Sequence, residues 1–98
     1  MRLIFDWDEK KNALNKKAHG ISFEVAARVF YDPLCKCEPD IAHSDSEERF
    51  ITVGYISQHS CIMVVHTTQE LDDDCTVIRI ISARKLDKSE RKRHENDL

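Results

Sequence analysis

The segment Arg79–Asp87, with the sequence RIISARKLD, is a β-branched run that ends abruptly in basic residues. Its isoleucines predict a β-strand. Arg79 stands inside this apolar run rather than at its end. Because a guanidinium inside a sheet is costly unless an anion meets it, Arg79 is a candidate ligand for a phosphate group.

Positive charge is concentrated at the end of a chain whose formal net charge is −3. Only Asp87 and Glu90 oppose the basic residues of this region, which are Arg84, Lys85, Lys88, Arg91, Lys92 and Arg93. Such segregation is typical of a phosphate-binding face on an otherwise acidic protein.

The composition predicts one domain over residues 1–98, with 41% hydrophobic and 34% charged residues and therefore a small core. The apolar start of the chain is interrupted by Asp6 and Asp8, too early for a signal peptide. No stretch has the length and apolarity of a membrane span. A cytoplasmic protein is expected.

The four cysteines are Cys35, Cys37, Cys61 and Cys75. Without an export signal, reduced thiols are expected rather than disulfides. The spacing of the first two is not the usual zinc-knuckle spacing. A small zinc protein that adds His43 or His59 to these thiols stays open as an alternative, although no metal or cofactor is expected.

The N-terminal part predicts a strand over Leu3–Trp7 and a helix over Glu9–Ala18. Asp8 is a good N-cap, and Gly20 is suited to the position after a helix. Leu14 lies in helical register with the tryptophan of the strand, so both side chains are expected in the core.

A second helix should begin after Ser22 and end at the Asp32-Pro33 pair. Its apolar residues recur at i, i+3, i+4 and i+7, the clearest helical stripe in the chain; they are Phe23, Ala26, Ala27 and Phe30. The stripe needs a sheet face to cover it, so both phenylalanines should be almost fully buried.

The segment Tyr31–Glu48 has no periodicity and predicts a long loop, with or without one short strand. Strands are expected over Arg49–Ile56, Cys61–Thr68 and Cys75–Arg84, joined by hairpin-length turns into an antiparallel meander. The middle strand is apolar on both faces near its centre, which predicts that both faces are covered. The fold class is therefore α+β, with helices on an antiparallel sheet.

A basic C-terminal helix should begin at Asp87, which with Glu90 has the pattern of a capping box. A role of Glu90 as a general base is a less favoured alternative. The remainder, up to Asn96, has no apolar stripe. A helix that is polar all round is either weakly held or completed by a partner.

Together, short motifs in this order resemble the BrnT toxin family over about Phe5–Glu95. They are FDWD at 5–8, Asn15, HGISF at 19–23, ERF at 48–50, VVHT at 64–67 and RIISARK at 79–85. The resemblance implies a RelE-like ribonuclease toxin of a bacterial type II toxin–antitoxin pair that arrests translation. Family members often have Lys before the His-Gly pair, where this chain has Ala18, so Lys17 is a possible substitute.

The resemblance also implies a partner, a BrnA-like antitoxin with a ribbon-helix-helix domain, in a hetero-oligomer that contacts operator DNA only through the antitoxin. An acidic antitoxin segment is expected over the basic face and the C-terminal helix, with Arg91 and Arg93 in contact. The alternative site is the first helix, with Lys10, Lys16 and Lys17. A RelE-like binding module without turnover, acting as partner or co-repressor of a DNA-binding protein, stays open.

Metal-free RNA cleavage needs a base for the 2′-hydroxyl proton, a cation for the charge on phosphorus and an acid for the leaving oxygen. The catalytic candidates are His66, Arg79 and Arg84; the RNA-binding candidates are Lys17, His19, Lys85 and Arg91. His66 is expected near Arg79, with a half-buried, hydrogen-bonded histidine as the alternative.

Arg79 and Arg84 differ by an odd number, so a regular strand places them on opposite faces. A bulge near Ser82-Ala83 would reunite them. Pairing with an acid of the turn Asp72–Asp74 is the alternative for Arg79.

Overall fold

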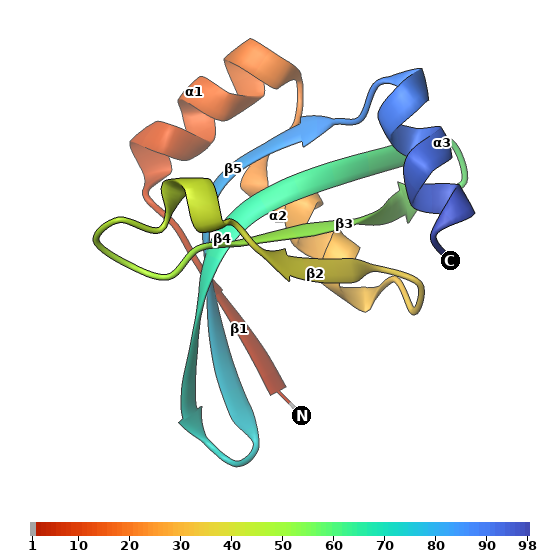
Figure 1. The fold of residues 1–98 in the computed structure, drawn as a ribbon. Coiled ribbons are helices and arrows are strands. Elements are labelled where there is room, and N and C mark those ends of the chain that lie inside the picture. The colour runs from red at the N-terminus through yellow and green to blue at the C-terminus, as the bar shows by residue number, and fades with distance from the viewer. Residues whose placement is uncertain (1) are drawn as a thin grey trace.

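Five strands form one mixed sheet in the order β1-β5-β4-β3-β2 (Figure 1). This computed structural model describes residues 2–98. The strands are β1 (Arg2–Asp6), β2 (Lys36–Pro39), β3 (Phe50–Ser57), β4 (Ser60–Asp72) and β5 (Cys75–Lys85). The predicted antiparallel meander is confirmed for β3, β4 and β5, and β2 adds an antiparallel edge. β1 pairs parallel to β5, so the sheet is not purely antiparallel as predicted.

The core lies on one face of the sheet, called the covered face here, where β4 and β5 meet α2 (Phe23–Ala26) and the 3-10 helix η1 (Ala27–Tyr31). The strands contribute Ile62, Val64, Ile78, Ile80 and Ala83 to it. The opposite face, called the open face, carries α3 (Lys88–Asn96) at one end. The predicted α+β class is confirmed.

The second helix is shorter than its stripe predicts. Ser22 caps it as expected, but the α-helical part ends at Ala26 and continues as η1. A 3-10 helix has three residues per turn, so Val29 joins Phe23, Ala26 and Ala27 as a buried residue in place of Phe30. Phe23 is fully buried, whereas Phe30 is only half-buried at the edge of the core.

The first helix, α1 (Glu9–His19), is capped by Asp8 and ends at Gly20, whose φ of 74° is left-handed. The prediction that Leu14 belongs to the core is wrong, because its side chain is 66% exposed. The buried residues of α1 are instead Asn12 and Asn15. The helix is therefore attached through amide side chains rather than through an apolar stripe.

The segment between η1 and β3 contains β2 and a short 3-10 helix, η2 (Ile41–His43), so the prediction of a loop with one strand is confirmed. Next to it, β4 is fully covered on only one side. On the open face, Met63 and Val65 are half-buried, which corrects the prediction of a strand covered on both sides. This leaves part of the open face accessible.

The C-terminal helix α3 begins with the predicted capping box, in which Asp87 and Glu90 exchange hydrogen bonds. Its one buried residue is His94, whose ring centroid lies 6.2 Å from that of Tyr55. The Tyr55 hydroxyl also bonds Glu95. Polar contacts of this kind hold a helix that has no apolar stripe.

Two findings within residues 2–98 bear on the other protein classes. No helix there is long and apolar enough to cross a membrane. No three His, Cys, Asp or Glu side chains in that range gather as metal ligands would, and the four cysteines are free. The zinc alternative thus lacks a ligand cluster in the part of the chain that the structure describes.

Candidate functional site

A β-bulge in β5 decides which side chains share the open face. Val65 of β4 pairs with Ser82, and the next residue, His66, pairs with Ile80, so Ile81 has no partner. The extra residue reverses the alternation of the strand. Arg79 and Arg84 lie opposite Thr67 and Met63 of β4, which share one face. The two arginines are thus reunited by a bulge, one residue before the predicted position.

The open face is hollowed above this bulge. A cavity of about 290 Å³ has an apolar floor and a polar rim. The floor consists of Ile51, Met63, Val65 and Ile81, and the rim of Asp40, His43, Arg49 and Ser82. Arg79 and Arg84 do not line this open-face hollow, but they lie on the same face of β5, on either side of Ile81 and Ser82 in the chain.

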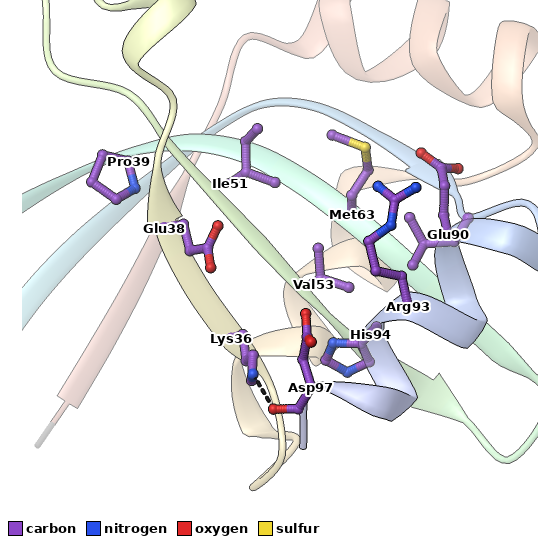
Figure 2. A pocket seen from close by; sticks show the side chains of 11 residues that line it. Lys36, Glu38, Pro39, Ile51, Val53, Met63, Glu90, Arg93, His94 and Asp97 are labelled. Carbon is purple, nitrogen blue, oxygen red and sulfur yellow. Dashed lines mark hydrogen bonds between the residues drawn. The ribbon is translucent and has the colours of Figure 1, made fainter.

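A second cavity, of about 250 Å³, adjoins the first below α3. The two cavities share Ile51 and Met63. Figure 2 shows the α3 side chains, among them Arg93 and His94, on one side of this second cavity and Lys36 of β2 on the other. The two cavities therefore lie next to each other on the open face.

Arg84 is held by α3. Its two terminal nitrogens donate to the two carboxylate oxygens of Glu90 at 2.9 and 2.8 Å. The hydrogen bond from Arg84 lowers the pKa of Glu90 to about 2, and Glu90 in turn raises the pKa of Arg84. Glu90 is therefore an anion that caps α3 and binds Arg84, which leaves it unsuited to the alternative role of general base.

Arg79 is paired with an acid, but not with the acid that the sequence suggested. Its guanidinium bonds the carboxylate of Asp6, because the parallel register places Asp6 of β1 beside it. The alternative partner in the turn Asp72–Asp74 is wrong. The Arg79 side chain is 48% exposed, so it lies at an accessible surface and not within the core.

His66 lies on the covered face, so the predicted placement beside Arg79 is wrong. It is 1% exposed, and its Nε2 is 2.7 Å from the Thr52 hydroxyl. Phe30 and Phe50 pack against the ring. Burial lowers the pKa of His66. The alternation of β4 decides this placement, since residues 62, 64 and 66 face the core together.

The RNA-binding candidates are not gathered at one place. Lys17 and His19 are exposed at the end of α1. Lys85 lies opposite Ile62, on the covered-face side of the strand end, and Arg91 is half-buried on α3. None of the four lines the open-face hollow.

Sequence reasoning missed three polar residues of the rim, Asp40, His43 and Arg49. It considered His43 only as a metal ligand. The available signal was the Asp-x-x-His spacing, which places two side chains on one side of a single helical turn. The signal is weak because the surrounding segment has no periodicity.

The fold and the open face define a class: a small α+β protein with arginines around an exposed hollow, an arrangement suited to anionic ligands. A family model described as the ribonuclease toxin BrnT of type II toxin–antitoxin systems matches residues 7–90. The chain therefore belongs to the BrnT family.

A solved structure supports the fold. The chain is similar to the crystal structure of the Brucella abortus ribonuclease toxin BrnT, with a TM-score of 0.65 and 21% identity. The match covers 90% of this chain and 100% of that one. No curated protein sequence matches the chain. Family membership implies an RNA substrate and an antitoxin partner.

Proposed function

We propose that this chain is a RelE-like endoribonuclease that cleaves RNA at the open-face hollow without a metal ion. In this proposal it acts in the cytoplasm, arrests translation and is neutralised by a ribbon-helix-helix antitoxin that alone contacts the operator. The observation that carries the proposal is the bulge at Ile81, because it brings Arg79 and Arg84 to the face that also presents Arg49.

The three arginines are suited to a phosphodiester chain rather than to one phosphate. Arg79 and Arg84 are five positions apart, which is up to roughly 16 Å along a strand. They would therefore contact different phosphates of one RNA strand. The planar fork of Arg84 already holds the two oxygens of Glu90, and a phosphate presents the same pair of acceptors.

The test measures growth arrest and RNA cleavage for the variants Arg79→Ala and Arg84→Ala, with Asp6→Asn as the matched control. Loss of a cation that stabilises the transition state typically costs about 100-fold or more in rate. We expect Arg79→Ala to abolish growth arrest and to keep its fold by circular dichroism. Asp6→Asn removes the ion pair but retains the guanidinium, so it should remain toxic.

A fully toxic, folded Arg79→Ala variant would remove Arg79 from the mechanism. If each of the single variants Asp6→Asn and Arg79→Ala loses activity, the ion pair between β1 and β5 has a structural role, and the loss does not identify Arg79 as a catalytic cation.

A non-catalytic binding module is the second candidate, because Glu90 already occupies the fork of Arg84. In that reading the chain acts only as partner or co-repressor of a DNA-binding protein. Cleavage of ribosome-free RNA by the purified protein separates the two functions. Cleavage that Arg84→Ala abolishes would exclude the binding module.

A further inference from the structure

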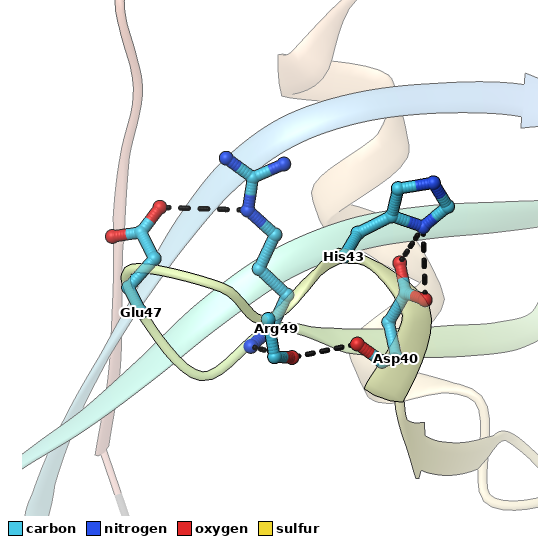
Figure 3. Close-up of polar contacts among 5 residues, drawn as sticks. Asp40, His43, Glu47 and Arg49 are labelled. Carbon is cyan, nitrogen blue, oxygen red and sulfur yellow. Dashed lines mark hydrogen bonds and ion pairs between the residues drawn. The ribbon is translucent and has the colours of Figure 1, made fainter.

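Asp40 and His43 form a hydrogen-bonded dyad at the rim of the open-face hollow (Figure 3). Nδ1 of His43 lies 3.1 and 3.0 Å from the two carboxylate oxygens of Asp40. Both side chains belong to the single 3-10 turn of η2 and its cap. Residues three apart in a 3-10 turn are eclipsed, which accounts for the contact.

The burial of the two partners differs sharply. The Asp40 side chain is 10% exposed, whereas the His43 side chain is 71% exposed. A carboxylate only accepts hydrogen bonds, so Nδ1 of the neutral imidazole carries the proton. Nε2 is then left with a free lone pair at the accessible end of the ring. The ring is thus oriented as a proton acceptor.

Backbone contacts hold Asp40 in place. Its N–H donates to the carbonyl of Arg49 at 2.8 Å, and its own carbonyl accepts from the Ser44 hydroxyl at 2.6 Å. That hydroxyl accepts in turn from the backbone N–H of Arg49 at 3.0 Å. Asp40 is therefore held by Arg49, the residue that precedes β3, and its position does not depend on the imidazole alone.

A guanidinium shares the hollow with the dyad. Figure 3 shows the Arg49 and His43 side chains projecting to the same side of the segment. Within residues 2–98, the carboxylate that Arg49 approaches is that of Glu47, 3.5 Å from Nε. From β4 and β5 the hollow receives only the uncharged side chains of Met63, Val65, Ile81 and Ser82. Asp40, Glu47 and Arg49 are thus the charged groups around His43.

The alternative is a purely structural role, in which Asp40 and His43 only stabilise a surface turn. It explains the contact, but it does not explain why His43 and Arg49 line the same cavity as Ile81, the bulged residue of β5. An imidazole and a guanidinium at one cavity supply two of the three groups that cleavage of RNA through its 2′-hydroxyl requires, the proton acceptor and the cation.

We propose that His43 is the general base of the reaction and that Asp40 is its positioning residue; this rests on the proposed ribonuclease function. Nε2 takes the proton of the 2′-hydroxyl while O2′ forms a bond to phosphorus and the P–O5′ bond breaks. The departing 5′-oxygen takes a proton from solvent water, and His43 returns its proton to solvent. The products are a 2′,3′-cyclic phosphate and a 5′-hydroxyl, with no change in oxidation state.

The experiment measures single-turnover cleavage of a labelled RNA by the full chain between pH 5 and 8. The variants are His43→Ala and Asp40→Asn, with His59→Ala as the control, since His59 is exposed in the turn between β3 and β4. We expect His43→Ala to lose about 100-fold or more. The wild-type rate should fall towards acid pH, because a protonated imidazole cannot accept a proton, and that limb should be absent from His43→Ala.

A structural role would not reproduce two further results. Added imidazole should restore part of the rate of His43→Ala, because the ring is exposed at the rim. Asp40→Asn should show a smaller loss of rate than His43→Ala, because the ring keeps its Nε2 and loses only its positioning partner, while His59→Ala should match the wild type in rate.

The outcomes separate the two proposals. Wild-type protein that does not cleave RNA overturns the ribonuclease function and the dyad with it. Wild-type protein that cleaves, with His43→Ala equally fast and with the same acid limb, overturns the dyad alone. A slow but folded His43→Ala variant that keeps the acid limb and is not rescued by imidazole also rejects His43 as the base.

Discussion

At the scale of the residue, the environment of a histidine side chain decides whether it stabilises the fold or is available for proton transfer. His66 is enclosed by Phe30 and Phe50 and bonded to Thr52 on the covered face. His43 is exposed at the rim of the open-face hollow, where Asp40 contacts its Nδ1. A buried, hydrogen-bonded histidine contributes to stability, whereas an exposed and oriented one is available for proton transfer.

His66→Ala should lower the free energy of unfolding by about 2–4 kcal/mol, because it leaves a cavity and an unpaired Thr52 hydroxyl. Thr52→Val, which removes only the hydrogen-bond partner, should cost about 1–3 kcal/mol. Urea denaturation at pH 7.5 measures both. If His66 handled a proton, the variant would instead lose at least about tenfold in cleavage rate per folded molecule.

The buried position of His66 also predicts that the free energy of unfolding depends on pH. Burial lowers the pKa of His66 below its ordinary value of 6.5, so the unfolded state binds a proton more readily than the folded state. The stability of the wild type should therefore fall as the pH falls through 6.5. The difference between wild type and His66→Ala should be smaller at pH 5 than at pH 7.5, and an equal difference at both would contradict the assignment.

At the scale of the element, the amide side chain of Asn15 joins α1 to the sheet. Asn15 donates to the carbonyl of Ala83 at 2.8 Å and accepts from its N–H at 3.1 Å. It also donates to the carbonyl of Ile21 at 3.0 Å. Since β1 pairs with β5 only as far as Arg79, the amide satisfies backbone groups that no neighbouring strand reaches.

Asn15→Ala should destabilise the protein by about 2–4 kcal/mol, because buried backbone groups of Ala83 lose their partner. Leu14→Ala is the matched control at the preceding position of the helix; the Leu14 side chain is 66% exposed, so the change should stay within about 0.5 kcal/mol. Thermal and urea unfolding measure both. Equal losses for the two variants would mean that α1 is held by apolar contacts after all.

At the scale of the whole molecule, the two faces of the sheet differ in structure and in exposure. The covered face contains the apolar core, and the open face presents arginines around two adjoining cavities. The polar helix α3 borders the second cavity, with Arg93 in its lining. An acidic antitoxin segment that bound here would cover the arginines and compete with RNA for them.

Reversal of charge on α3, by Arg91→Glu with Arg93→Glu, should therefore weaken antitoxin binding at low salt. The main effect is expected on the association rate, because electrostatic steering is screened as salt rises. The control is a charge reversal on α1, by Lys10→Glu with Lys17→Glu, which changes the net charge by the same amount. Surface plasmon resonance at two salt concentrations measures the association rate of both variants with the antitoxin. If only the α1 variant associates more slowly, the antitoxin docks along α1 and not on α3.

The local features of this fold were predictable from the sequence by itself. Asp8, Ser22 and Asp87 begin helices because their side chains accept hydrogen bonds from backbone groups a few residues away. The strands of the meander follow from β-branched runs and short turns. Short motifs spread along the chain, from Phe5–Asp8 to Arg79–Lys85, were together sufficient to suggest the family that the comparison then showed.

Which side chains share a face was decided only by the tertiary structure. One unpaired residue, Ile81, brings Arg79 and Arg84 to the same side, while His66 goes to the other. The alternation in a strand predicts facing only while its register is regular, and the register depends on the partner strand. The pairing of Asn15 with Ala83 and the place of His43 likewise join segments far apart in the chain, and such contacts leave no periodic signal in the sequence.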